Sequence, residues 1–271
     1  MPADPVPAGP AAAATLEQHG HRVVRGTALS LAESPKLFIV CSDRTRCGKT
    51  LTARLYGDFL LLTGRNPLVF DTAPPPGGII DFYPERTVTV DFSRTLGQVA
   101  LFDTILGSPT RDTIVDLATQ HLQHFFDVMT EIDFLAEADR VGLLVCILYI
   151  TDRTAASLRA ARDIKERSGV VHLFTVCNEG VGLLTDRDAM SYAYSGLSPG
   201  SELVVPALDP DVIEAVEQPV FSFAGVVEGR QGRLSESELL RLLSFLNQVL
   251  PAIRQQFFGL DLSDLRRLGF V

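Results

Sequence analysis

The chain has 271 residues, 46% of them hydrophobic, and a net charge of −9 at pH 7. This length supplies the core of one large α/β domain or two small ones, and we expect one. The acidic balance argues against a protein covered in basic, nucleic-acid-binding surface, while a local basic patch stays open.

The cysteines and the apolar runs bear on the compartment. All four cysteines lie in or beside apolar, strand-like runs, which is typical of buried thiols in a reducing compartment: Cys41, Cys47, Cys146 and Cys177. The longest apolar run, residues 141–150, is half of what a bilayer span requires. The first residues show no basic segment followed by an apolar one, as a signal peptide would. We therefore expect a cytoplasmic protein with no integral membrane segment.

The elements expected along the chain alternate between strands and helices. Residues 1–34 are rich in Pro and Ala and lack apolar periodicity, which predicts a disordered tail. Residues 35–271 are expected to form a single domain. Within it the patterns predict strands at 36–41, 67–71, 86–92, 112–116, 141–150, 170–178 and 202–208, and helices at 50–63, 95–106, 120–139, 153–167, 209–216 and 235–257. This order predicts an α/β fold, with a mostly parallel central sheet and helices on both faces.

A Gly-Lys-Thr triplet stands between the first strand and the first helix, within "CSDRTRCGKT" at residues 41–50. A loop in this position points the amides and the positive dipole end of the helix at a bound anion. Gly48 then lets the backbone approach phosphates, Lys49 bridges the β- and γ-phosphates of ATP, and the Thr50 hydroxyl binds Mg²⁺. The alternative is a purely structural role, in which the loop is a tight turn with an exposed lysine.

The loop departs from the usual phosphate-binding pattern at its start. The pattern G-x-x-x-x-G-K-[ST] would place glycine at position 43, where this chain has Asp43. Its carboxylate adds negative charge near a polyphosphate unless it caps the loop or points away. Arg44 and Arg46 offer charge that offsets it.

The segment "RTRCGKT" resembles the deviant Walker A motif K-G-G-x-G-K-[ST] of the ParA/MinD ATPases, a family that includes MipZ-like proteins. The resemblance implies a P-loop nucleotide-binding domain over residues 35–271. It places Arg44 on the signature lysine, which reaches across a nucleotide-sandwich dimer to the phosphates of the partner. The loop and helix start would contact the nucleotide through six residues: Arg46, Cys47, Gly48, Lys49, Thr50 and Leu51.

Further segments fit the same resemblance. The strand ending at Asp71 looks like switch I, in which the family has a second aspartate where this chain has Ala73. That aspartate helps to position the attacking water, so its absence bears on hydrolysis. Asp116 ends a switch II-like strand beside Mg²⁺, Asn178 matches the asparagine that reads adenine, and Pro206 lies in the segment that closes around the base. Catalytic roles are thereby implied for Lys49, Arg44, Asp71 and Asp116, and metal binding for Thr50 and Asp116.

Several of these residues also have structural interpretations, as do two other clusters. Asp71 and Asp116 could be caps, and Asn178 could start a turn. His121, His124 and Asp127 recur on one helix face with metal-ligand types, although a solvated face is the commoner reason for such spacing. The helix expected at 153–167 carries a basic cluster of five residues: Arg153, Arg159, Arg162, Lys165 and Arg167. Such a cluster could bind DNA phosphates or form an ion-paired surface, and the acidic residues interleaved with it favour the ion-paired surface.

Three functional hypotheses stay open. The first is a slow Mg-dependent ATPase that forms a homodimer on ATP binding and acts with a protein partner as a switch for positioning or partition of DNA, plasmids or the bacterial division machinery. The second is a non-hydrolysing, ATP-dependent scaffold, because Ala73 provides no carboxylate to activate water. The third is a ligase of the dethiobiotin synthetase type. All three require ATP and Mg²⁺.

Overall fold

The computed structural model describes residues 34–73, 77–152, 154–170, 172–181, 202–231 and 234–267, with side chains as far as Phe257. The predicted N-terminal tail, residues 1–34, lies outside the described residues except for its last position.

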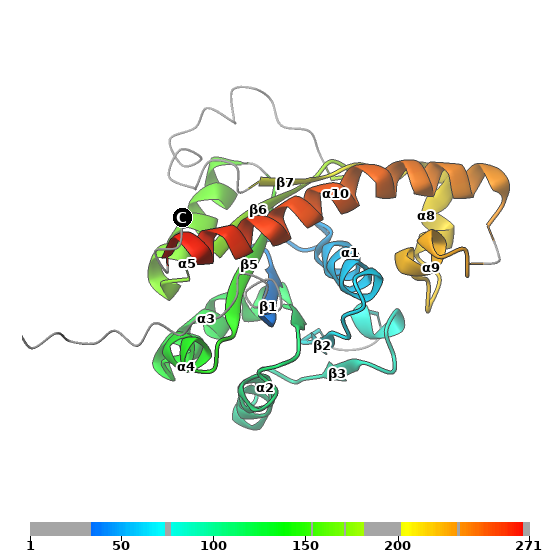
Figure 1. Ribbon diagram of the computed structural model, residues 1–271. Helices are drawn as coiled ribbons and strands as arrows, with labels where there is room; N and C mark the ends of the chain where they lie inside the picture. Colours follow the sequence, from blue (N-terminus) through cyan, green and yellow to red (C-terminus); the bar gives the residue numbers. More distant parts are fainter. Residues whose placement is uncertain are drawn as a thin grey trace, which may run out of the picture.

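One sheet of seven parallel strands forms the centre of the molecule, in the order β3-β2-β4-β1-β5-β6-β7 (Figure 1). The strands are β1 Lys36–Cys41, β2 Leu68–Asp71, β3 Thr87–Thr89, β4 Thr113–Asp116, β5 Leu144–Thr151, β6 His172–Asn178 and β7 Glu202–Val205. Asp71 pairs in register with Asp116, and Asn178 with Val205, so the carboxyl ends of these strands share one edge. The predicted α/β fold with a parallel sheet is confirmed.

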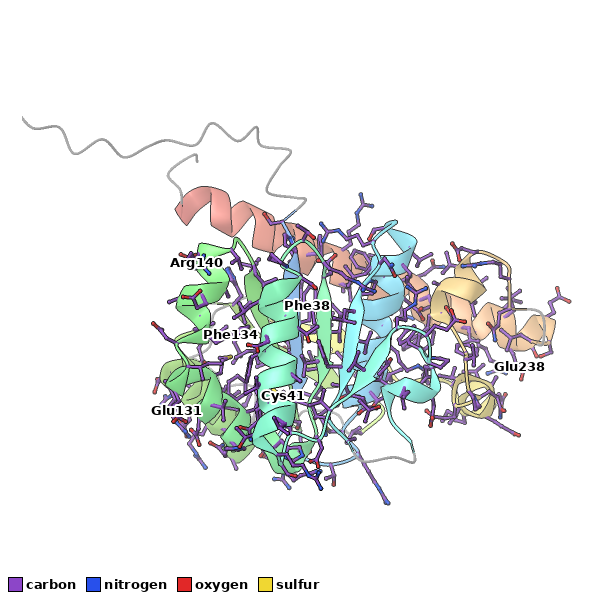
Figure 2. All side chains as sticks on the ribbon, turned by 90° about the horizontal axis from the view of Figure 1, so that it is seen from below. Phe38, Cys41, Glu131, Phe134, Arg140 and Glu238 are labelled. Atoms are coloured by element: carbon purple, nitrogen blue, oxygen red, sulfur yellow. The ribbon has the colours of Figure 1, made fainter. Side chains whose placement is uncertain are left out.

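Helices cover both faces of the sheet, because successive side chains of a buried strand point to opposite sides. One face carries α1 Lys49–Leu62, η1 Ile79–Asp81, α8 Pro210–Val216, α9 Phe223–Val227 and α10 Glu236–Arg267. The other carries α2 Thr95–Gly107, α3 Leu122–Glu131, α4 Phe134–Arg140 and α5 Ala155–Ser168, with η2 Thr119–His121 leading into α3. Figure 2 shows the two sides of β1, with α3 and α4 (Glu131, Phe134, Arg140) opposite the start of α10 (Glu238).

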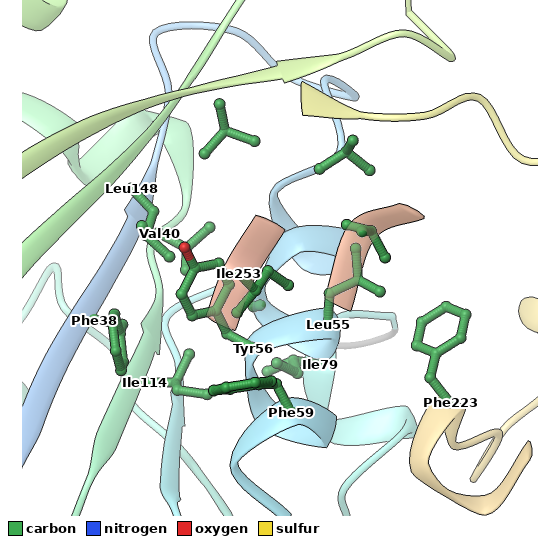
Figure 3. Close-up of a cluster of buried hydrophobic side chains, with 14 of the residues drawn as sticks. Phe38, Val40, Leu55, Tyr56, Phe59, Ile79, Ile114, Leu148, Phe223 and Ile253 are labelled. Carbon is green, nitrogen blue, oxygen red and sulfur yellow. The ribbon is translucent and has the colours of Figure 1, made fainter. Parts of the chain in front are cut away.

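The core of the first face packs the helix that follows the loop directly onto the sheet. In Figure 3 the sheet residues Phe38 and Val40 face Tyr56 and Phe59 of α1, while Ile253 of α10 closes the cluster. On the other side of β1, Leu37, Ile39 and Cys41 belong to the second core. All four cysteines are buried free thiols, as the sequence predicts.

A buried polar network anchors α1 to the last third of the chain. The Arg54 guanidinium stacks 3.5 Å from the centroid of the Phe82 ring and donates a hydrogen bond to the carbonyl oxygen of Val216 at 2.8 Å. Burial lowers the pKa of Arg54 to about 10, which leaves it charged at pH 7. Asp58, one turn further on, accepts a hydrogen bond from the backbone N–H of Phe223 at 2.6 Å. The helix that carries the phosphate-loop residues is thus held at both α8 and α9.

The bounds of several predicted elements differ from the structure: the strands expected over 141–150 and 202–208 are Leu144–Thr151 and Glu202–Val205, and the helix expected over 235–257 is Glu236–Arg267. The single helix expected over 120–139 is divided into α3 and α4, because Asp133 between them has φ 53. Aspartate tolerates this left-handed conformation. The turn brings Phe134 into the core, where the centroid of its ring lies 5.0 Å from that of Phe102. The strand expected over 86–92 pairs only at Thr87–Thr89, on the edge of the sheet.

Candidate functional site

The loop between β1 and α1, residues 42–48, lies where the central strands end. Gly48 closes it in a left-handed conformation, with φ 98 and ψ 23. A Cβ atom at Gly48 would stand 2.3 Å from the side-chain nitrogen of Asn178, so both backbone and space demand glycine. In the described part of the chain, no side chain caps the N-terminus of α1. Its first backbone N–H groups are therefore left for a ligand.

Lys49 is the first residue of α1, and its ammonium group lies over the loop. Its Nζ donates to the carbonyl oxygen of Arg44 at 3.1 Å and to Oγ1 of Thr119 at 2.8 Å. These contacts hold the positive charge beside the backbone that a phosphate group would approach. The side chain is thus hydrogen-bonded at the start of a helix, and phosphate binding by Lys49 stays a prediction.

Thr50 and Asp116, the two predicted metal ligands, are in direct contact. The Thr50 hydroxyl donates to Oδ2 of Asp116 at 2.7 Å, although 66 residues separate them in the sequence. Burial raises the pKa of Asp116 to about 6, and the negative charge of Asp71 adds to the rise, while Thr50 and Lys49 oppose it. A buried carboxylate and a hydroxyl are oxygen ligands of the kind that Mg²⁺ prefers.

Asp71 lies beside Asp116 but is engaged with its own loop. Its Oδ1 accepts a hydrogen bond from the backbone N–H of Ala73 at 2.9 Å, and Oδ2 accepts a longer one from Ile80 at 3.4 Å. A Cβ on Gly78 would stand 2.3 Å from Oδ2, so the loop closes tightly around this carboxylate. Burial raises the pKa of Asp71 as well. Asp71 thus fixes the switch I-like segment, and its catalytic role stays a prediction.

Asp43, the departure from the phosphate-loop pattern, is turned toward α5. Its Oδ1 accepts a hydrogen bond from the Ser157 hydroxyl at 3.0 Å, and its backbone N–H donates to the Tyr149 hydroxyl at 3.3 Å. Arg44 forms an ion pair with Asp152 at 3.2 Å, at the end of β5, with half of its side chain exposed. The carboxylate therefore points toward α5, as the alternative in which it turns away from the loop predicts, and it also lies 3.7 Å from the Arg44 guanidinium.

The remaining predicted contacts surround the same loop. Asn178 donates to the carbonyl oxygen of Cys47 at 3.2 Å and accepts from the backbone N–H of Gly180 at 3.0 Å, so its amide supports the loop itself. Pro206 follows β7, whose last residue pairs with Asn178. Three further residues lie at the loop or the start of α1. Arg46 is exposed, with φ 56, and the buried Cys47 thiol donates to the carbonyl oxygen of Arg44 at 3.3 Å. Leu51 packs against the first core. Base recognition by Asn178 and Pro206 stays a prediction.

Two site residues were missed in the sequence. Thr119, at the start of η2, contacts Lys49 and donates to the carbonyl oxygen of Arg44 at 3.0 Å. Thr72, directly after Asp71, accepts from the backbone N–H of Ala118 at 2.8 Å. A signal was present, because each is a hydroxyl within three residues of an aspartate that ends a strand.

The two alternative clusters have structural explanations. His121 and His124 both pack against the ring of Phe92, and Asp127 pairs with Arg167. Among the described residues, no group of three or more His, Cys, Asp or Glu side chains is placed to hold a metal ion. On α5, Arg162 pairs with Glu166 at 3.3 Å, as on an ion-paired surface. Arg153 lies outside the described residues.

Comparison with solved structures finds matches to this chain. No protein-family model matches the chain, and no curated protein matches it. The MinC:MinD cell division protein complex of Aquifex aeolicus is a structural match with 14% sequence identity and a TM-score of 0.43, covering 79% of this chain and 96% of that chain. No helix in the described ranges is long and apolar enough to span a membrane. Since no family model and no curated protein matches, the functional proposal depends on the geometry of the loop.

Proposed function

We propose that this chain binds Mg·ATP at residues 44–51 and acts as a nucleotide-dependent switch. The observation that carries the proposal is the contact of 2.7 Å between Thr50 and Asp116, directly beside the Lys49 ammonium. A hydroxyl at the start of α1 and a buried carboxylate at the end of β4 are brought together beside a helix N-terminus, and they form a donor set suited to a metal-bound polyphosphate.

The chain's own residues divide the work of binding. Thr50 and Asp116 would hold Mg²⁺, which supplies positive charge that neutralises the phosphates. Lys49 and the N–H groups at the start of α1 would contact phosphate oxygens, and Gly48 leaves the room that their approach requires. Since Mg²⁺ binding needs an ionised carboxylate, proton loss from Asp116 precedes metal binding at acidic pH.

We propose that this chain hydrolyses ATP slowly at most. The carboxylate of Asp71 already accepts hydrogen bonds from its own loop, and Ala73 adds no second carboxylate. The alternative of a non-hydrolysing scaffold is favoured by the same observation. In either case the switch works through the segments that surround the loop.

We propose that ATP drives formation of a homodimer, with Arg44 reaching the phosphates of the second copy. Its guanidinium is half exposed beside the loop and is held by Asp152 through a pair that solvent screens. The switch would act with a protein partner in positioning or partition in a bacterial cytoplasm. DNA binding is not favoured, because the chain carries a charge of −9 and basic residues of α5 are ion-paired.

The test measures binding and turnover separately. A fluorescent ATP analogue is titrated with Mg²⁺ into the full chain, and ADP release is followed at rising protein concentration. Lys49→Ala should abolish binding, while Lys165→Ala, the same change on α5, should not. Turnover that rises more than linearly with protein concentration supports a dimerising ATPase, and binding without turnover supports the scaffold. Equal binding by the wild type and Lys49→Ala would overturn the proposal.

A further inference from the structure

A hydrogen-bonded triangle joins the phosphate loop to the start of η2. The Lys49 ammonium donates to Oγ1 of Thr119 at 2.8 Å and to the carbonyl oxygen of Arg44 at 3.1 Å, and the Thr119 hydroxyl donates to that same carbonyl at 3.0 Å. Lys49 and Thr119 are 70 residues apart in the sequence. The triangle is therefore a tertiary contact between two separate loops.

The donors and acceptors of this triangle are matched. A hydroxyl has one proton to donate, and Thr119 uses it on the Arg44 carbonyl while a lone pair accepts from Lys49. An oxygen that accepts from an ammonium forms a charge-assisted bond, stronger than a neutral one. Thr119 thus presents to Lys49 the same kind of acceptor that a phosphate oxygen presents. A phosphate group and the Thr119 hydroxyl compete for this ammonium.

The backbone around Thr119 connects this competition to α3. Thr119 is the first residue of η2, which runs directly into α3 at Leu122. The preceding N–H, that of Ala118, is held by the Thr72 hydroxyl at 2.8 Å, next to the switch I-like loop. Both switch-like segments therefore converge on the residue that contacts Lys49.

We propose that Thr119 is a positioning residue that reports whether the phosphate loop is filled. In the nucleotide-free chain Lys49 ties η2 and the start of α3 to the loop. When phosphate oxygens take the ammonium, the bond between Lys49 and Thr119 is lost, and of the triangle only the bond from Thr119 to the Arg44 carbonyl still holds this segment. The inference rests on the proposed function, since it requires nucleotide at the loop.

The test compares Thr119→Val, which removes the hydroxyl and keeps the shape, with Thr119→Ser, which keeps the hydroxyl. Affinity for a non-hydrolysable ATP analogue with Mg²⁺ is measured by calorimetry on the full chain. Because the wild type must break the Lys49 to Thr119 bond on binding, Thr119→Val should bind about 3- to 10-fold more tightly. Thr119→Ser should match the wild type. A variant that is merely destabilised would not bind more tightly, and Thr119→Ala provides a second hydroxyl-free chain.

Amide hydrogen exchange supplies a readout that needs no turnover. The analogue should speed exchange at 119–125 in the wild type, and ligand-free Thr119→Val should already show the faster rates. Unchanged or weaker binding by both Thr119→Val and Thr119→Ala would overturn the inference while the proposed function stands. Failure of the wild type to bind the analogue would overturn the proposed function and this inference with it.

Discussion

Gly48→Ala tests whether the loop depends on close contact with Asn178. With φ at 98, a side chain at this position is strained by about 1–2 kcal/mol. The new Cβ would also stand 2.3 Å from the Asn178 side-chain nitrogen, so that amide must move and give up its bonds to Cys47 and Gly180. At about 1 kcal/mol for each bond, the total loss in the free energy of unfolding is about 3–4 kcal/mol.

The double mutant separates the backbone strain at position 48 from the steric clash with Asn178. Asn178→Ala alone should cost about 2 kcal/mol, because the same two bonds are lost. In Gly48→Ala/Asn178→Ala those bonds are lost only once, so the double mutant should cost about 2 kcal/mol less than the sum of the single mutants. Urea denaturation followed by circular dichroism measures all four chains. Additive effects, or a cost for Gly48→Ala below about 0.5 kcal/mol, would refute the reasoning.

Four further predictions concern charged groups. Mg²⁺-dependent nucleotide affinity should rise between about pH 5 and 7 as Asp116 loses its proton, and Asp116→Asn should remove this dependence. Because the pKa of Asp116 is raised to about 6, the ligand-free wild type should lose stability in urea as the pH rises from about 4 to 6. The mutant should lose less, since burial also raises the pKa of Asp58, Asp71 and Asp112. Asp58→Ala should cost about 3 kcal/mol in urea denaturation, since the buried N–H of Phe223 loses its acceptor. Asp152→Asn should change stability by less than about 1 kcal/mol and strengthen ATP-dependent dimerisation in light scattering, because it removes the shorter of the two ion pairs that hold Arg44.

Local patterns were sufficient to predict most of the sheet and the loop. Apolar strands alternating with amphipathic segments predict a parallel sheet, and parallel strands bring their carboxyl ends to one edge. This rule places Asp116 at the edge where the loop after β1 begins, and that loop brings Thr50, at the start of α1, beside it. The helix break at Asp133 was not predictable from periodicity, because the apolar pattern continues across it and the turn is set by the burial of Phe134 against α2.

The contacts that decide how the loop works involve residues distant in the sequence. Asp43 meets Ser157 across 114 positions, so its orientation away from the loop follows from the packing of α5. Thr119 was missed for the same reason, although its place three residues after Asp116 was a usable signal. Arg54 and Asp58 are charged residues one turn apart on α1, and both are buried. Their burial depends on aromatic residues that arrive much later in the chain.

Binding and hydrolysis make separable demands on this site. The proposed binding requires a lysine, a hydroxyl and a carboxylate at the end of a strand, and Lys49, Thr50 and Asp116 would meet that demand, with Thr50 and Asp116 in direct contact. Hydrolysis also requires a group that positions water, whereas Asp71 is turned to its own loop and position 73 is alanine. Thr119 connects the binding set, not the hydrolytic one, to α3. We therefore expect the conformational response to follow occupancy of the loop and to precede any release of ADP, so that a chain unable to hydrolyse ATP would still switch.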